Sequence, residues 1–189
     1  MKNLMFRFWP SAFLFLFCAP RLLAGPVVIN EIMYHPASGN LNESYVELYN
    51  PTTGAVDVSG WQFTKGLQYV FPANMVLAAG GYLVVAADET AFAGKYPGVL
   101  NVVAGWTPPM STHLQLSDAG GNVISDVKFS KDGDWATRLL TTNYPDAFGE
   151  LSWEWSVPSD GIGSSLELMN PNLPESYALN WDSSTTMDG

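Results

Sequence analysis

The sequence predicts an all-β sandwich with one short helix at about residues 89–96. Short apolar or alternating runs recur at intervals of roughly ten residues, which is typical of β-sandwiches. Turns rich in Gly, Pro, Asn and Asp separate these runs. Only one segment has the cap, the length and the terminating residues of a helix. We therefore expect two packed sheets rather than a helical bundle or an α/β fold.

The first two predicted strands, residues 27–33 and 45–50, are joined by a loop rich in Pro, Ser, Gly and Asn. In the second strand, polar or aromatic residues alternate with apolar ones, which is the two-residue period of a strand with one buried face. Pro51 ends this strand because it has no N–H to donate to a ladder. Each strand carries one acidic residue in apolar or aromatic company, Glu31 and Glu47.

The middle of the chain continues the pattern of short runs and turns. Residues 82–86 are continuously apolar, which is typical of a central strand buried on both faces. Asp88 has the position of an N-cap for the helix at 89–96, and Pro97-Gly98 ends that helix. The other predicted strands are residues 56–58, 61–63, 69–71, 75–77, 100–104, 114–116, 123–129, 153–155 and 165–169, and residues 130–149 are predicted to form a long loop.

The first 24 residues have the order of regions found in a secretory signal peptide. Lys2 and Arg7 precede an apolar run at residues 11–19, and Ala24 provides a small residue at the expected cleavage site. This run is well short of the ~20 apolar residues that a transmembrane helix needs. We therefore expect a signal peptide at residues 1–24, a folded domain at 25–182 and a tail at 183–189, in a protein that is secreted or held at the cell surface or in the periplasm without a transmembrane anchor.

Cleavage would make an acidic chain more acidic. Loss of Lys2, Arg7 and Arg21 from the eight basic residues leaves five against 18 acidic ones, a net charge of −13. A field of that sign repels nucleic-acid phosphates and anionic lipids, so no nucleic-acid partner is expected. The only cysteine, Cys18, would be removed too, which excludes a disulfide, a thiolate metal site and a cysteine nucleophile.

Several segments in order resemble the lamin tail domain, in the form found in exported bacterial proteins. They are INEI (29–32), YVELYN (45–50), VDVSGW (56–61), GGYLVV (80–85), DAGGNVI (118–124) and SLEL (165–168). The resemblance implies an immunoglobulin-like β-sandwich with no catalytic apparatus, serving as an accessory or adhesive module. The family's closing segment would begin at residues 187–189, so we expect either a truncated tail or the start of a longer protein.

The paired acidic residues and the acidic turns are the candidates for ion binding. Glu31 and Glu47 could bind a cation or act as a carboxylate pair. A structural role, with both carboxylates accepting hydrogen bonds, is favoured because no further polar groups accompany them. For calcium, Asp132 and Asp134 are the first candidates, although no turn fits the twelve-residue calcium loop. No other cofactor is expected.

Catalysis has little support in the sequence. His35 and His113 are the only histidines, and neither belongs to a Gly-x-Ser-x-Gly or His-Glu-x-x-His motif. We therefore predict that the chain is not an enzyme. The favoured hypothesis is an exported binding, adhesive or structural module with protein or polysaccharide contacts. The alternatives are an accessory domain of a larger exported enzyme and, least favoured, a metal-dependent hydrolase.

Tryptophans are the other candidates for ligand contact. Trp106 and Trp135 adjoin Pro- or Asp-rich loops and are predicted to be exposed binding residues. Trp61 and Trp155 are assigned to the core, since large aromatics commonly fill a sandwich. An alternative is that Trp153 and Trp155, which share one face of a predicted strand, form a platform on which sugar rings stack.

Overall fold

The computed structural model describes residues 25–140, 147–150 and 152–185. Its strands are β1 (Val28–Met33), β2 (Tyr45–Tyr49), β3 (Val56–Asp57), β4 (Gln62–Lys65), β5 (Tyr69–Val70), β6 (Val76–Leu77), β7 (Tyr82–Ala86), β8 (Val102–Ala104), β9 (His113–Ser117), β10 (Val123–Lys128), β11 (Thr137–Leu140), β12 (Trp153–Ser156), β13 (Leu166–Leu168) and β14 (Trp181–Ser183). The helices in this part of the chain are α1 (Glu89–Lys95) and the single turns η1 (Leu41–Glu43), η2 (Gly133–Trp135) and η3 (Ala178–Asn180).

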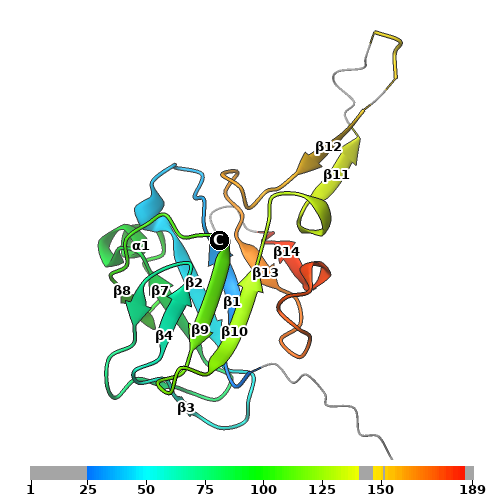
Figure 1. Ribbon diagram of the computed structural model, residues 1–189. Coiled ribbons are helices and arrows are strands. Elements are labelled where there is room, and N and C mark those ends of the chain that lie inside the picture. The colour runs from blue at the N-terminus through cyan, green and yellow to red at the C-terminus, as the bar shows by residue number, and fades with distance from the viewer. Residues whose placement is uncertain (1–24, 141–146, 151, 186–189) are drawn as a thin grey trace, which may run out of the picture.

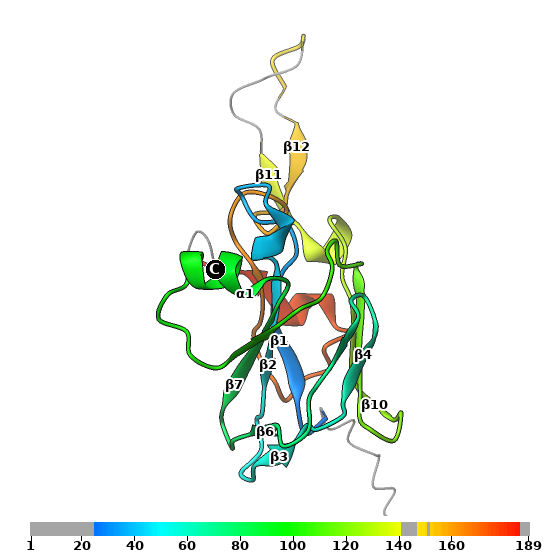
Figure 2. The same cartoon turned by 90° about the vertical axis from the view of Figure 1, so that its left-hand side faces the viewer.

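Two sheets face each other in the body of the molecule (Figures 1 and 2). The larger has the order β14-β13-β1-β2-β7-β8, and the smaller has the order β10-β9-β4-β5. All pairs in these sheets are antiparallel except β7 with β8. The short pair β3-β6 and the ribbon β11-β12 complete the fold. The predicted all-β architecture with one α-helix is confirmed for the described residues.

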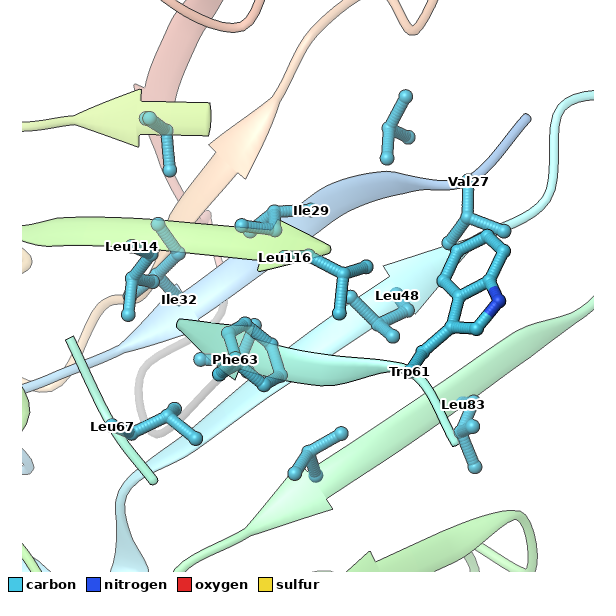
Figure 3. Packing of buried hydrophobic residues seen from close by; sticks show 14 of the residues in the cluster. Val27, Ile29, Ile32, Leu48, Trp61, Phe63, Leu67, Leu83, Leu114 and Leu116 are labelled. Carbon is cyan, nitrogen blue, oxygen red and sulfur yellow. The ribbon is translucent and has the colours of Figure 1, made fainter. Parts of the chain in front are cut away.

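Apolar side chains from both sheets fill the space between them. In β2, Val46 and Leu48 point inward and are fully buried, while Glu47 between them points to the outer face. This alternation is the one that the sequence predicts. Figure 3 shows Ile32, Leu48 and Leu83 of the larger sheet near Phe63, Leu114 and Leu116 of the smaller one.

Helix α1 covers one end of the outer face of the larger sheet. Its N-cap is Asp88, as predicted, and the Asp88 side chain accepts a hydrogen bond from the Ala91 N–H at 2.8 Å. Phe92 of α1 packs on a second apolar cluster that includes Val84 of β7. The opposite side of β7 contributes Val85 to the main core, so this strand is buried on both faces, as its apolar run predicts.

Two strands were not predicted. β11 lies within residues 130–149, where a long loop was expected, and it pairs with β12. Together they form a ribbon that extends away from the sandwich in both views (Figures 1 and 2). β14 follows η3 and adds to the edge of the larger sheet beside β13. No helix in the described part of the chain is long and apolar enough to cross a membrane.

Candidate functional site

A row of four carboxylates crosses the outer face of the larger sheet. Glu31 of β1 lies opposite Glu47 of β2 on one side and opposite Glu167 of β13 on the other. Glu167 in turn lies opposite Asp182 of β14. Directly opposite residues of neighbouring strands project to the same face, so these four side chains form one acidic row. The sequence singled out Glu31 and Glu47, but not the two residues that extend the row.

Neutral donors hold the first two members of the acidic row. The Tyr45 hydroxyl and the Ser165 hydroxyl, the latter at 2.6 Å, donate to Glu31 Oε1. Asn30 Nδ2 donates to Glu47 Oε1 at 2.9 Å. Burial raises the pKa of Glu47 to about 7, and the charges of Glu31 and Glu167 add to this effect. These contacts are those of hydrogen-bonded structural carboxylates, and that role stays a prediction.

The part of the chain that the structure describes contains no cluster of metal-ligating side chains. There, no group of three or more His, Cys, Asp or Glu side chains could hold a metal ion. Asp132 accepts a hydrogen bond from the Ser130 hydroxyl at 2.7 Å. Asp134 lies in η2 and lines a pocket described below. Among the described residues, none adds a third His, Cys, Asp or Glu to these two aspartates, and a calcium site stays a prediction.

Each histidine pairs with an aspartate. His35 Nδ1 lies 2.7 Å from Asp160 Oδ1, which also receives Lys131 Nζ at 2.8 Å. Burial alone would raise the pKa of Asp160, but the hydrogen bonds and charges of Lys131 and His35 outweigh it and lower the pKa. His113 Nε2 lies 3.1 Å from Asp126 Oδ1. Among the described residues, neither imidazole is hydrogen-bonded to a hydroxyl nucleophile, so neither pair has the geometry of a nucleophilic triad.

Glu175 is the buried carboxylate that sequence reasoning missed. It accepts hydrogen bonds from the Ile29 N–H at 2.9 Å, the Ser125 hydroxyl at 2.6 Å and the Asp126 N–H at 3.2 Å. Ile29 belongs to β1 and Ser125 to β10, so Glu175 ties the two sheets together. Burial raises its pKa to about 7 in spite of these hydrogen bonds. Its position in a Pro- and Asn-rich loop gave no signal of this role.

The structure reverses two of the predictions about tryptophans. Trp106 is buried in the core, where its Nε1 donates to Val85 O at 3.2 Å, so the prediction that it is an exposed binding residue is wrong. Trp155 is 52% exposed on β12, so its assignment to the core is also wrong. Trp135 is half-buried and packs against the main core. Trp61 is buried, as predicted.

An exposed aromatic pair lies on the β11–β12 ribbon. Trp153 is 58% exposed and Trp155 is 52% exposed. Two positions apart on one strand, they project to the same face at a spacing of about 7 Å. The ribbon extends from the sandwich (Figure 1), and more than half of each indole-bearing residue is exposed to solvent. This is the platform geometry that the alternative interpretation of the sequence proposed.

A pocket of 230 Å³ lies where the ribbon joins the body of the molecule. Trp135 and Trp181 line it, with ring centroids 6.2 Å apart and an angle of 40° between the ring planes. Asp134 and Asp182 also line it, and Asp182 is the end of the acidic row. We call this the Trp135–Trp181 pocket. The sequence could not have indicated it, because residues 134–137 and 179–183 meet only in the folded chain.

A family model described as the Lamin Tail Domain matches residues 23–137, which is more than half of the chain. No curated protein matches the chain. The matched range contains β1 to β10 and ends where β11 begins, so the ribbon's second strand and both β13 and β14 lie beyond it.

Proposed function

This chain belongs to the lamin tail domain family of immunoglobulin-like, non-enzymatic modules, and from that premise we propose that it is an exported binding module that contacts polysaccharide through the β11–β12 ribbon. The ligand is held by surface contact, without covalent chemistry. The competing possibility is that the ribbon binds a protein partner, and the experiment below distinguishes the two ligands.

The observation that carries this proposal is the exposure of Trp153 and Trp155 on one face of a projecting ribbon. Aromatic residues are enriched at contact surfaces, and an exposed group of them on a protein surface marks a contact site. A flat indole ring offers an apolar face to the C–H face of a sugar ring, and two such rings in line suit a chain of sugars. The aromatic pair is therefore the best-supported contact surface of the molecule.

The remaining polar groups support a non-catalytic role. The Glu31 and Glu47 carboxylates accept hydrogen bonds from Tyr45, Ser165 and Asn30. A general acid or base needs a pocket in which substrate reaches the carboxylate. Neither glutamate lines the Trp135–Trp181 pocket or the 530 Å³ groove beside Trp106.

Export is supported by the composition of residues 1–24, with a basic start, an apolar centre and a small residue at Ala24. The intact mass of the native protein, recovered from culture medium or cell envelope, tests this part of the proposal. A chain that begins at Gly25 supports cleavage by the export machinery. A chain that keeps Met1 and stays in the cytoplasm contradicts it.

Retention on immobilised polysaccharides tests the binding surface. We expect Trp153→Ala and Trp155→Ala each to weaken retention by about tenfold, because a central aromatic contact contributes on the order of 1–2 kcal/mol. The melting temperature should not change, because both side chains lie outside the core. Val70→Ala, which removes an exposed apolar side chain from the smaller sheet, is the matched control.

Three results are informative. Loss of retention in the two tryptophan variants alone supports the proposal. Equal retention of all variants on every polysaccharide that the protein binds excludes the ribbon as the contact surface. Absence of polysaccharide binding, with a protein partner captured in a tryptophan-dependent way, replaces polysaccharide by protein as the ligand.

A further inference from the structure

The Trp135–Trp181 pocket combines aromatic faces with negative charge. Trp181 is buried, and its Nε1 donates to Glu175 O at 2.8 Å, so its ring is fixed. Trp135 is half-buried and lines the pocket. Ser156 and Ser183 add hydroxyl groups to the wall. The rings and their supports are in place before a ligand binds, which reduces the entropy lost on binding.

The described part of the pocket wall carries negative charge. Asp134 and Asp182 line it, and no Lys, Arg or His does among the side chains that the structure describes. Glu167 lies opposite Asp182 on the neighbouring strand, and the charge of Asp182 contributes to the raised pKa of Glu167, after burial and the charge of Glu31. Ionised carboxylates beside aromatic walls of low dielectric constant create a concentrated negative potential in the pocket. The pocket therefore favours a cationic group over a neutral or anionic one.

The hydrogen bonds along the edge of β14 determine whether a partner strand can add there. In the register of β14 on β13, the N–H groups of Trp181 and Ser183 face away from the sheet. The Trp181 N–H donates to Ala178 O, and the Ser183 N–H donates to Asp182 Oδ1 at 2.8 Å. Because both outward N–H groups are occupied, an added strand would find no donor at these positions. These positions therefore disfavour a ligand that binds by adding a strand.

We propose that the Trp135–Trp181 pocket binds a guanidinium group, presented as an arginine side chain by a partner protein. A guanidinium is planar, so it stacks on an indole face, and its fork of N–H donors bonds a carboxylate through two parallel hydrogen bonds. Trp135 supplies the stacking face and Asp134 beside it supplies an acceptor, while Asp182, which projects to the outer face of β14, adds negative charge at the rim of the pocket. A metal ion fits less well, since the described residues add no third acidic or histidine ligand to the two aspartates.

This site stands apart from the polysaccharide surface proposed above. The pocket is lined by Ser156, whereas Trp155 precedes it on the strand and projects to the opposite face of the ribbon. Variants of Trp153 and Trp155 should therefore leave guanidinium binding unchanged. The two proposals can fail independently.

The experiment uses Nα-acetyl-arginine methylamide as the probe, titrated into the isotope-labelled protein. We expect saturable shifts of the Trp135 and Trp181 indole N–H resonances, with a Kd on the order of 1 mM. The citrulline analogue, which has the same shape and no charge, should bind at least about tenfold more weakly. The lysine analogue should also bind more weakly, since an ammonium lacks the planar fork.

Charge-removing variants make the test specific. Asp134→Asn should weaken binding by about fivefold to tenfold, and Asp182→Asn by about twofold to threefold through the loss of its charge. Asparagine at 182 keeps an oxygen to accept the Ser183 N–H, so the edge of β14 is preserved. Glu89→Gln, at an exposed site on α1, is the control for net charge and should have no effect.

Four outcomes overturn the proposal in whole or in part. Shifts that do not saturate, or that persist in Asp134→Asn and Asp182→Asn, exclude the pocket. Equal binding of the citrulline analogue excludes recognition of charge, and equal binding of the lysine analogue excludes selectivity for guanidinium. Tighter binding of free arginine than of the amide excludes a protein side chain as the source, because the acidic row should repel a free α-carboxylate.

Discussion

Glu175 shows at the scale of one residue how β1, inside the larger sheet, is joined to β10, the edge strand of the smaller sheet. In the pairing of β10 with β9, the Asp126 N–H faces outward from the sheet edge, and Glu175 caps it. The Ile29 N–H lies at the irregularity in the register of β1 on β2 and donates to the same carboxylate. One side chain thus satisfies donors that neither sheet satisfies by itself.

Removal of this carboxylate should be costly. Glu175→Ala leaves the Ser125 hydroxyl and the Asp126 N–H without the acceptor that they share, while the Ile29 N–H keeps only its 3.2 Å hydrogen bond to Ser125 Oγ. Each unsatisfied buried polar group costs about 1–3 kcal/mol, and partial hydration reduces the sum, so we expect the free energy of unfolding to fall by about 2–4 kcal/mol. Urea denaturation measures this. Glu89→Ala should cost about 0.5 kcal/mol or less as the exposed control. A similar small loss for Glu175→Ala would contradict the role of Glu175 as a tie between the sheets.

The two carboxyls with a pKa of about 7, Glu47 and Glu175, predict that stability falls as pH rises. In the unfolded chain both would titrate at the ordinary value of 4.5. The folded state therefore binds protons more tightly, and this contribution is complete below 4.5 and is lost as pH rises through about 7. Glu167, whose pKa is also raised, acts in the same direction. We expect a loss of about 2–4 kcal/mol in the free energy of unfolding, with the half-buried Glu47 giving the smaller share.

Urea denaturation at pH 5 and at pH 8 measures this dependence. Glu175→Gln has no titratable group at that position and should reduce the difference between the two pH values. The carboxyls whose pKa is lowered, including Asp118 and Asp160, titrate below this window and do not contribute to it. Stability that rises from pH 5 to pH 8 would show that the buried carboxyls are ionised at little cost.

Glu175 and Trp106 depart from the predictions at the residue scale for a common physical reason. Glu31 and Glu47 were recognisable because an acid on an apolar strand is conspicuous. Glu175 lies in a loop, where acids are ordinary. Trp106 follows Gly105, whose φ of 121° belongs to a backbone conformation that glycine favours and that turns the next residue toward the core. Flanking residues do not report such a change of direction, so Trp106 was expected at the surface.

At the scale of elements, the predictions succeeded where the signal is local. β7 and α1 match the expected positions closely, because a continuous apolar run and a capped helix are defined by neighbouring residues. β11 and β14 were missed because their strand conformation depends on pairing. β11 exists through its register with β12, in which Thr137 lies opposite Ser156, and β14 through its register with β13. A three-residue strand carries too few residues for a period of two to be visible.

At the scale of the whole molecule, the folding unit is larger than the range that the family model matches. That range ends at residue 137. Beyond it, β13 pairs with β1 in the interior of the larger sheet, and Leu166, Leu168 and Trp181 are buried in the main core. Glu175, which ties the sheets together, also lies beyond it. The sandwich is therefore complete only when residues 166–183 are present, and we infer that the domain extends to that point.

This inference predicts that a chain ended after Thr137 does not fold. It would lose three buried apolar side chains, at about 1.5–3 kcal/mol each, together with the ladder of β13 on β1 and the Glu175 hydrogen bonds. Their sum is comparable to the whole free energy of unfolding of a typical domain. We expect the shortened chain to show no cooperative thermal transition by circular dichroism.

A deletion confined to the ribbon is the control that separates lost core from lost length. Because Thr137 and Ser156 lie opposite each other, a two-residue Asn-Gly turn can replace residues 138–155 and close the hairpin at its base. Since the ribbon extends from the sandwich, this variant should unfold within about 1 kcal/mol of the full chain while losing Trp153 and Trp155. Cooperative folding of the chain ended at Thr137, at nearly the full melting temperature, would instead make the family range the folding unit and reduce β13 and β14 to an appendage. The ribbon deletion also tests the proposed function. It should abolish polysaccharide retention in a protein whose sandwich is intact.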